Sequence, residues 1–416
     1  MTNGTLARGW LVWGLAALFY CYGFFQRVAP SVMVADLMAD LSVNAAALGQ
    51  LSAYYFYAYA SLQIPVGLLL DRWGVRWVLT AAAALAALGS LLFGVAEGLA
   101  AASLGRFLVG TGAAFTWVGA LTVATTWLPP QRFALVSGLT LMLGMAGAVG
   151  GQAPLAALVG AVGWRETMTG AAAVGLGLAV LLGLILRDRP RAPAAPEAAG
   201  GFWRNLGAAL VRRQTLLAAL YGAGMTGPML AFGALWAVPY LMRAHGLDRP
   251  DAAFSASLML IGWAIGAPGG GWLSDRLGRR RPVMLVASTG VLVTLGAAIY
   301  APGLPVAAVQ GLLLLNGVFG GGMVICFAAA RDSAPAHQGA ATMGVVNTAV
   351  MATGAAFQPL IGWLLDRNWT GAMADGARVY DRAAYETAFL TLVGCGIAAL
   401  VAALLLKETG RAATGR

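Results

Sequence analysis

Uncharged apolar runs recur along the whole of this sequence and are separated by short polar stretches. A run of about 18 or more apolar residues is long enough to cross the hydrocarbon core of a bilayer as an α-helix. Hydrophobic residues make up 60% of the 416 positions and charged residues 10%, which leaves too little polar surface to coat a water-soluble core. The sequence therefore predicts an all-α membrane protein that crosses the bilayer many times.

The lengths of the runs predict twelve transmembrane helices. The first run begins near Trp10 and is too long for the apolar region of a signal peptide, so we expect it to be retained as the first helix. The expected helices lie at 10–34, 46–70, 77–96, 100–126, 133–161, 167–186, 214–242, 252–274, 283–300, 305–330, 339–365 and 385–406.

Basic residues are distributed unequally between the two sides of this layout. Of the 26 Lys and Arg residues, 18 lie on the side that carries both termini, 6 lie on the opposite side and 2 lie inside helices. Basic loops favour the cytoplasmic side of a membrane. We therefore expect a multi-pass protein of the inner (plasma) membrane with both termini in the cytoplasm.

A polar stretch near the middle of the chain divides the helices into two sets of six. It contains Pro190, Pro193 and Pro196 and is followed by a basic amphipathic piece. The expected organisation is an N-terminal bundle at 1–186, a cytoplasmic linker at 187–213 and a C-terminal bundle at 214–416. The linker either lies on the anionic inner leaflet or is a solvated tether.

The loops after the second and eighth helices resemble each other, and their aspartates are separated by about half the chain. Gly, Asp, Arg and Gly hold the same offsets in both copies, which indicates an internal duplication. An aspartate at a helix end can face the positive N-terminus of another helix, and glycine permits close approach and tight turns. The expected gating residues are Gly67, Asp71, Arg72, Gly74 and Arg76 in the first copy, and Asp275, Arg276, Gly278 and Arg279 in the second.

With these loops the sequence resembles the major facilitator superfamily of secondary transporters over nearly its whole length. The resemblance implies two pseudo-symmetric six-helix bundles that rock about a central site. It also implies that the first loop faces the helix starting near Gly339 and the second faces the fifth helix, closing the cytoplasmic side in the outward-open state. The alternative is a basic turn that only fixes topology.

Two arginines, Arg27 and Arg106, lie inside expected helices, while all 16 acidic residues fall in loops or at helix ends. A charged residue within a membrane is costly and is a functional hypothesis by default. An unpaired guanidinium favours a carboxylate or phosphate, which it grips through two parallel hydrogen bonds. Arg27 is therefore the expected anion-binding residue, and its alternative is a structural arginine bonded to main-chain carbonyls and Gln26.

The segment Phe25–Ser31 resembles the first-helix motif of two anion-carrying branches of the superfamily, the anion:cation symporters and the organophosphate antiporters. Gln26 and Ala113 stand where the symporter branch commonly has acids, which weakens the case for its proton relay. Arg106 matches the family's fourth-helix arginine and has either a bracing or a coupling role. The other expected substrate-binding residues are polar or aromatic side chains of expected helices: Gln26, Tyr20, Tyr55, Tyr59, Trp117, Tyr221, Trp236, Asn316 and Asn347.

Motifs for enzyme, metal or nucleic-acid chemistry are not found in this sequence. Cys21, Cys326 and Cys395 have no ligand spacing, and His245 and His337 lie in separate polar stretches. The net charge of +10 comes from short inter-helix loops rather than a clustered basic face with interleaved aromatics. We expect no metal, no cofactor, no nucleic acid and no catalytic residues.

These observations favour a transporter that moves a small organic anion or zwitterion by alternating access, in the uptake direction. The expected partners are that solute, a proton or counter-solute, and the lipid bilayer, with the protein acting as a monomer. An exporter of amphipathic compounds or siderophores is the alternative within the same class. A non-transporting receptor or a membrane-embedded enzyme is the alternative from other classes, and the duplicated loops and missing catalytic clusters count against both.

Overall fold

The computed structural model describes residues 3–63, 65–188, 201–335 and 338–409, and this part of the chain is almost entirely helical. Within it, eleven helices are long and apolar enough to cross a membrane. The predicted second span, 46–70, is also helical, as α3 (Ala45–Leu62) followed by α4 (Pro65–Trp73). Four tyrosines and a glutamine interrupt the apolar residues of α3, which is not among the eleven. All twelve predicted segments are therefore helical.

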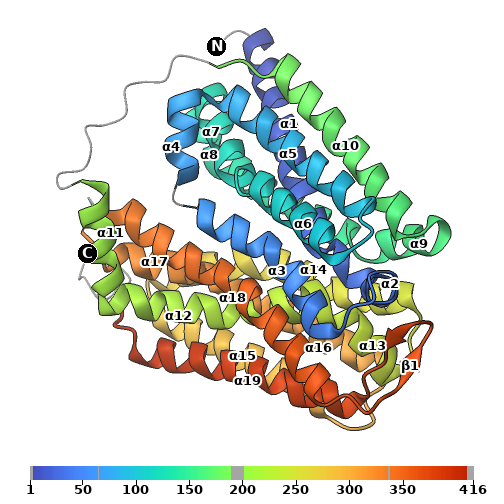
Figure 1. The fold of residues 1–416 in the computed structure, drawn as a ribbon. Helices are drawn as coiled ribbons and strands as arrows, with labels where there is room; N and C mark the ends of the chain where they lie inside the picture. The colour runs from blue at the N-terminus through green and yellow to red at the C-terminus, as the bar shows by residue number, and fades with distance from the viewer. Residues whose placement is uncertain (1–2, 64, 189–200, 336–337, 410–416) are drawn as a thin grey trace.

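Figure 1 shows the helices in two groups that lie against each other. The first group follows the chain from its start. It consists of α1 (Asn3–Val28), η1 (Ala29–Val32), α2 (Val34–Asp40), α3, α4, α5 (Val75–Gly94), α6 (Leu99–Ala113), α7 (Thr116–Trp127), η2 (Pro130–Arg132), α8 (Phe133–Gly150), α9 (Ala153–Val162) and α10 (Trp164–Ile185).

The second group begins after the linker helix α11 (Phe202–Val211). It consists of α12 (Arg213–Gly227), η3 (Pro228–Trp236), α13 (Ala237–His245), α14 (Arg249–Leu277), α15 (Arg281–Tyr300), α16 (Val306–Gly320), η4 (Gly321–Val324), α17 (Ile325–Asp332), α18 (Gly339–Arg367), the strands β1 (Met373–Ala374) and β2 (Ala377–Arg378), and α19 (Arg382–Leu405). The two strands pair antiparallel as a hairpin.

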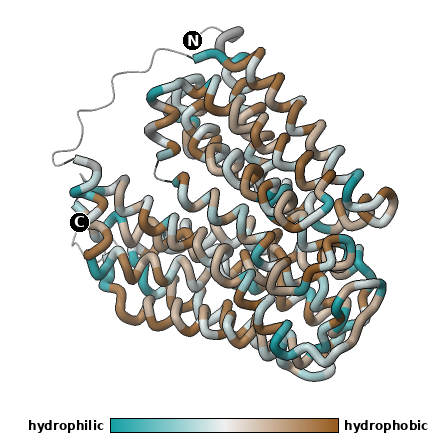
Figure 2. The backbone as a smooth tube through the Cα atoms, viewed as in Figure 1, coloured by the Kyte–Doolittle hydropathy of each residue, from teal (hydrophilic) through white to brown (hydrophobic). Residues whose placement is uncertain are grey.

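Both termini and α11 lie at one end of the molecule, and the β1–β2 hairpin lies at the other (Figure 1). We call these ends the linker side and the hairpin side. Large apolar side chains on the helix surfaces are exposed, among them Leu184 and Val174. Hydrophobic residues run along the helices (Figure 2), as expected for surfaces that face lipid.

Glycine or proline interrupts several of the membrane helices within their apolar runs. Pro228 opens η3, a stretch of π-helix. In a bilayer, main-chain groups released by such breaks need partners from inside the protein. Gln358 donates to the Leu230 oxygen at 2.7 Å, and Gln152 donates to the Gly233 oxygen at 3.2 Å. A glutamine from α18 and a glutamine between α8 and α9 therefore donate hydrogen bonds to main-chain oxygens of this π-helix.

The two groups touch along α3 and α18, and along α8 and α9 against α14. The α3–α18 contact is close because glycines lie on both helices. A Cβ added at Gly362 would overlap the Ala45 oxygen, and one at Gly49 would overlap the Gln358 oxygen. These contacts bring the groups together toward the hairpin side.

On the linker side, each group repeats the same arrangement. Arg76, at the start of α5, donates from Nε to the Gly183 oxygen near the end of α10 at 2.9 Å. Arg281, at the start of α15, donates to the Ala403 and Leu404 oxygens near the end of α19. An arginine beside helix C-terminal carbonyls complements both their unused oxygens and the helix dipole. The structural counterpart of Arg76 is thus Arg281.

Candidate functional site

Arg27 lies in the last turn of α1, just before the short 3-10 segment η1. Its side chain is buried, with 4% of its surface exposed. The guanidinium carbon lies 4.2 Å from the ring centre of Phe24, 5.2 Å from that of Tyr59 and 5.6 Å from that of Tyr55. Three aromatic rings therefore surround the cation, an arrangement that stabilises positive charge without neutralising it.

Arg27 donates a hydrogen bond to a tyrosine hydroxyl. Its Nε donates to the Tyr55 hydroxyl at 3.3 Å, and that hydroxyl donates to the Gly23 oxygen at 3.3 Å. No carboxylate forms an ion pair with Arg27 in the part of the chain that the structure describes. The positive charge of this group is thus matched by rings and a hydroxyl.

Two further predicted residues join this cluster from α1 and α7. The Tyr20 ring lies 4.8 Å from Phe24 and 5.4 Å from Trp117, measured between ring centres. The structure therefore brings Tyr20, Tyr55, Tyr59 and Trp117 together with Arg27, as a cationic group within an aromatic cluster. We call these five residues and Phe24 the Arg27 cluster.

Gln26 points elsewhere, although it is adjacent to Arg27. Its Nε2 donates to the Tyr22 hydroxyl at 2.7 Å and to Ser90 Oγ at 2.9 Å. Tyr22 and Ser90 in turn donate to main-chain oxygens of α10. These bonds hold α1 against α5 and α10, which explains the position of Gln26 by packing.

Arg106 on α6 supports α1 through the main chain. Its Nη1 donates to the Gln26 oxygen at 2.7 Å. In a regular helix that oxygen would accept from the residue four positions later, but this residue is Pro30, which has no N–H. The guanidinium of Arg106 lies 5.1 Å from the Tyr55 ring centre, so Tyr55 contacts both arginines. The remaining Nε and Nη2 of Arg106 are buried without a partner among the described atoms.

In the part of the chain that the structure describes, the predicted residues of the second half bond to other residues than the Arg27 cluster, and most of them join helices. Tyr221 donates to the Met284 oxygen at 3.3 Å, and Asn316 donates to the Val291 oxygen at 3.0 Å. Trp236 donates to the Gln358 oxygen at 3.2 Å. Asn347 differs because its Nδ2 donates to Oε1 of Gln63, the residue that follows α3, across the two groups.

In the first loop motif, Gly74 and Arg76 contact Asp188 at the start of the linker, and Arg76 also bonds the end of α10. Gly74 has a φ of +80° and packs against the Asp188 carboxylate, which accepts from the Arg76 amide at 3.0 Å. A Cβ at Gly67 would meet nothing within 4 Å, so the expected close approach is not made in this conformation. Arg72 is exposed, and the side chain of Asp71 lies outside the described part.

In the second motif, Asp275 forms an ion pair with Arg280, which also contacts Asp332 at 3.3 Å. Arg276 lies over the Trp272 ring, 5.1 Å from its centre, and Gly278 ends α14 with a φ of +61°. The Arg279 oxygen accepts from Ser274. The bonds described for the two motifs thus lie on the linker side, and none of them joins the first half to the second.

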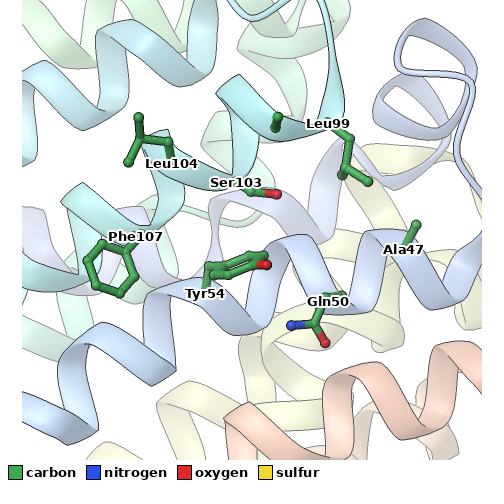
Figure 3. Close-up of a pocket in the computed structure, with 8 residues that line it drawn as sticks. Ala47, Gln50, Tyr54, Leu99, Ser103, Leu104 and Phe107 are labelled. Carbon is green, nitrogen blue, oxygen red and sulfur yellow. The ribbon is translucent and has the colours of Figure 1, made fainter.

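A pocket of about 710 Å³ lies between α3 and α6. Figure 3 shows Gln50 and Tyr54 on one wall and Ser103, Leu104 and Phe107 on the other. Tyr54 faces this pocket, whereas the adjacent Tyr55 faces Arg27. The sequence analysis did not predict this pocket. Most of its lining residues are apolar, and in the sequence such residues are not distinguished from those that face lipid.

The structure has many helices long and apolar enough to cross a membrane and a buried cation in the last turn of α1, and sequence comparison identifies the family. The model of the Major Facilitator Superfamily matches residues 15–359 and 229–414. This chain belongs to the Major Facilitator Superfamily. The predicted fold class, twelve helices in two pseudo-symmetric bundles, is confirmed.

Several curated members of the superfamily resemble this chain. The probable sulfoacetate transporter SauU of Cupriavidus necator is 26% identical over 300 residues, 68% of each chain. The membrane sensor protein UhpC of Salmonella typhimurium is 27% identical, over 88% of this chain and 86% of its own. The gallate transporter of Pseudomonas putida is 26% identical, over 98% of this chain and 93% of its own.

A solved superfamily structure has the same fold. It is a bacterial homologue of the human lysosomal transporter Spinster in an inward-facing and occupied conformation. The TM-score is 0.76, with 18% identity and 95% of each chain covered. At 18% identity this similarity supports the fold of the present chain and gives no information on the solute that it binds.

Proposed function

We propose that this chain is a secondary active transporter of a small organic anion or zwitterion bearing a carboxylate, working by alternating access. The proposal depends on one observation, the position of Arg27. This guanidinium is buried in a membrane helix and surrounded by rings, and no described carboxylate pairs with it. A carboxylate solute would neutralise the charge through charge-assisted hydrogen bonds.

The aromatic cluster suits the rest of such a solute. Tyr20, Tyr59 and Trp117 offer ring faces to its apolar part, and the Tyr55 hydroxyl offers a hydrogen bond. The names of two relatives support this chemistry, since both sulfoacetate and gallate are carboxylates.

The remaining features of the proposal follow the family fold. The bundles at 1–186 and 214–416 are the moving units, joined by the linker at 187–213, and the two loop motifs close the linker side in the other conformation. The distribution of arginines supports a linker side in the cytoplasm and an inner-membrane location. Uptake as a monomer, coupled to a proton or counter-solute, completes the proposal.

The test is a proteoliposome panel of monocarboxylates, dicarboxylates, amino acids, sugar acids and phosphate esters, with and without a pH gradient. We expect flux of at least one carboxylate by the natural chain and none by Arg27→Ala. Arg27→Lys is the matched variant, because it keeps the charge and loses the two-bond grip. Movement of neutral sugars or lipophilic cations alone, or undiminished carboxylate flux by Arg27→Ala, overturns the proposal.

The similarity to a membrane sensor protein favours a second candidate, a receptor that binds its solute without moving it. Such a receptor would use the same Arg27 cluster. The panel separates the two candidates, since a sensor binds the carboxylate in a thermal-shift assay but produces no flux.

A further inference from the structure

The linker helix α11 packs one face against the second group of helices. Ala209 is buried and forms a small apolar cluster with Ala341 and Val345 of α18, and Leu206 packs against this cluster. Ala341 and Val345 belong to the stretch of α18 that is apolar enough to span a membrane, which begins at Ala341. α11 therefore lies beside the first turns of a membrane helix, at the depth where a bilayer meets water.

Hydrogen bonds fix α11 to the ends of neighbouring helices. Arg212, which separates α11 from α12, donates to the Ser333 oxygen after α17 at 3.3 Å and to Gln338 Oε1 before α18. In Figure 1, α11 crosses the linker end of the second group instead of running along its helices. α11 is thus a fixed element, and its direction is that of a helix lying in the plane of a membrane surface.

The other face of α11 is exposed and apolar. The exposed fraction is 76% for Trp203, 50% for Leu210 and 80% for Val211. Trp203 and Leu210 are about two helical turns apart and Val211 follows, so the three side chains lie on the side away from the buried Asn205 and Ala209. Tryptophan is enriched where a membrane meets water, because its ring is apolar and its N–H is polar.

Two arginines flank this apolar face. Arg204 is exposed on α11, directly after Trp203, and Arg213 is exposed at the start of α12. The sequence from Gly201 to Gln214 contains no acidic residue, so the charge of this segment is entirely positive. The phosphate groups of anionic lipids complement such a charge.

We propose that α11 is an interfacial helix that binds anionic phospholipids of the linker-side leaflet. Trp203, Leu210 and Val211 enter the boundary between headgroups and acyl chains, and Arg204 and Arg213 contact headgroup phosphates. Lipid is favoured over a protein partner because α11 packs against residues that already belong to a membrane span. Of the two expectations for the linker, its helical end thus follows the one that places it on the leaflet, and the proposal goes beyond the transport function.

The two parts of the face contribute differently to lipid binding. The apolar side chains bind any phospholipid, whereas each arginine near an anionic surface strengthens binding by about fivefold. This electrostatic part weakens at high ionic strength, because salt screens exposed charges. The proposal therefore predicts a depth of α11 in the membrane that depends on lipid charge, on the arginines and on salt.

The test measures the depth of α11 in the full chain, with the three native cysteines replaced by alanine. A nitroxide at Leu210→Cys is studied in vesicles of phosphatidylcholine alone and in vesicles that also contain phosphatidylglycerol. Its depth follows from its accessibility to oxygen, which concentrates in the bilayer, and to a water-soluble nickel complex. Leu184→Cys on the exposed surface of the span α10 is the bilayer reference, and Ala372→Cys, exposed before the hairpin, is the water reference.

With phosphatidylglycerol present, we expect the label at Leu210→Cys to resemble the bilayer reference more closely than in phosphatidylcholine alone. Arg204→Gln should lower the ratio of inserted to exposed label by about fivefold, and high salt should act in the same direction. Arg132→Gln is the matched control, because Arg132 is an exposed linker-side arginine of the first group and its replacement changes the net charge equally. It should leave the label unchanged.

A label as accessible to the nickel complex as the Ala372→Cys reference in both kinds of vesicle overturns the proposal. Equal depth in the two kinds of vesicle, or equal effects of Arg204→Gln and Arg132→Gln, contradicts the selection of anionic lipid. A label shielded in native membranes but exposed in vesicles of lipid alone would show that a protein covers this face. Val211→Cys is the second label position if Leu210→Cys does not fold, and the measurement uses no solute, so its outcome is independent of the solute panel.

Discussion

Arg106 on α6 donates a 2.7 Å hydrogen bond to the main-chain oxygen of Gln26 on α1. The oxygen needs this donor because Pro30 stands where its helical partner would be. The bond fixes the main chain one residue before Arg27. A side chain on one helix thus sets the position of the proposed anion-binding group on another.

The first prediction concerns the replacement of Arg106 by an uncharged chain of similar length. Arg106→Met loses the bond to Gln26, at about 1–2 kcal/mol, but it also removes a buried guanidinium with two unpartnered nitrogen atoms. These effects oppose each other, so we expect the free energy of unfolding to change by about 1 kcal/mol or less. Carboxylate affinity should fall about tenfold because Arg27 is no longer held in place.

Thermal unfolding and equilibrium binding of a carboxylate found in the panel measure these two effects. A large loss of stability with full affinity would show that Arg106 serves the fold alone. Gln26→Leu is the comparison, since it removes the side-chain bonds to Tyr22 and Ser90 and keeps the main-chain oxygen.

A second prediction separates two adjacent tyrosines on α3. Tyr55→Phe keeps the ring beside both arginines and removes the hydroxyl that accepts from Arg27 and donates to Gly23. The loss of about 0.5–1.5 kcal/mol corresponds to an affinity between about twofold and tenfold weaker. Tyr54→Phe is the control, because Tyr54 faces the pocket between α3 and α6. Equal effects of the two changes on the dissociation constant would contradict the role given to Tyr55.

Much of the fold follows from the apolar runs, because length and hydrophobicity are all that a spanning helix requires. The breaks inside the helices were not predicted. Pro228 begins a π-helix whose oxygens bind glutamines from distant helices, and no local pattern reveals those partners. Of the four tyrosines of α3, the two that the sequence analysis selected, Tyr55 and Tyr59, are buried, whereas Tyr57 is exposed.

For the candidate site, sequence reasoning reached Arg27 and its aromatic neighbours because charge inside a membrane is rare. It placed Gln26 with them by adjacency, but neighbouring residues of a helix point about 100° apart, and Gln26 faces Ser90. Pro30 follows Gln26 by four residues and has no N–H, so the sequence already indicated that the main-chain oxygen of Gln26 lacks its helical donor.

The third prediction tests whether the first loop motif closes against another helix in a second conformation. Here Gly67 has open space around it, whereas Gly74 has a positive φ and contacts Asp188. Gly74→Ala should therefore lower stability in this conformation by about 1–2 kcal/mol. Gly67→Leu should leave stability unchanged but slow transport at least tenfold, because a side chain there blocks close approach in the other conformation.

The measurements are thermal unfolding in detergent and flux in proteoliposomes. Full transport by Gly67→Leu would favour the alternative interpretation, a basic turn that fixes topology without gating.

The last prediction uses the close packing of α3 against α18 to change the conformational equilibrium. Gly362→Ala places a methyl group against the Ala45 oxygen, so the closed hairpin side is overpacked by about 2 kcal/mol and the open state gains about thirtyfold in relative population. Ser42 and Met373 line one pocket between the start of α3 and the hairpin. Spin labels on cysteines placed at these two positions, with the native cysteines replaced by alanine, report the distance between them by pulsed electron paramagnetic resonance. Gly147→Ala is the control, because its methyl group would overlap the Cys21 oxygen within one half. That clash is present in both conformations, so Gly147→Ala should lower the unfolding temperature and leave the distance distribution unchanged. If Gly362→Ala and Gly147→Ala give the same distance distribution, α3 and α18 do not separate during opening.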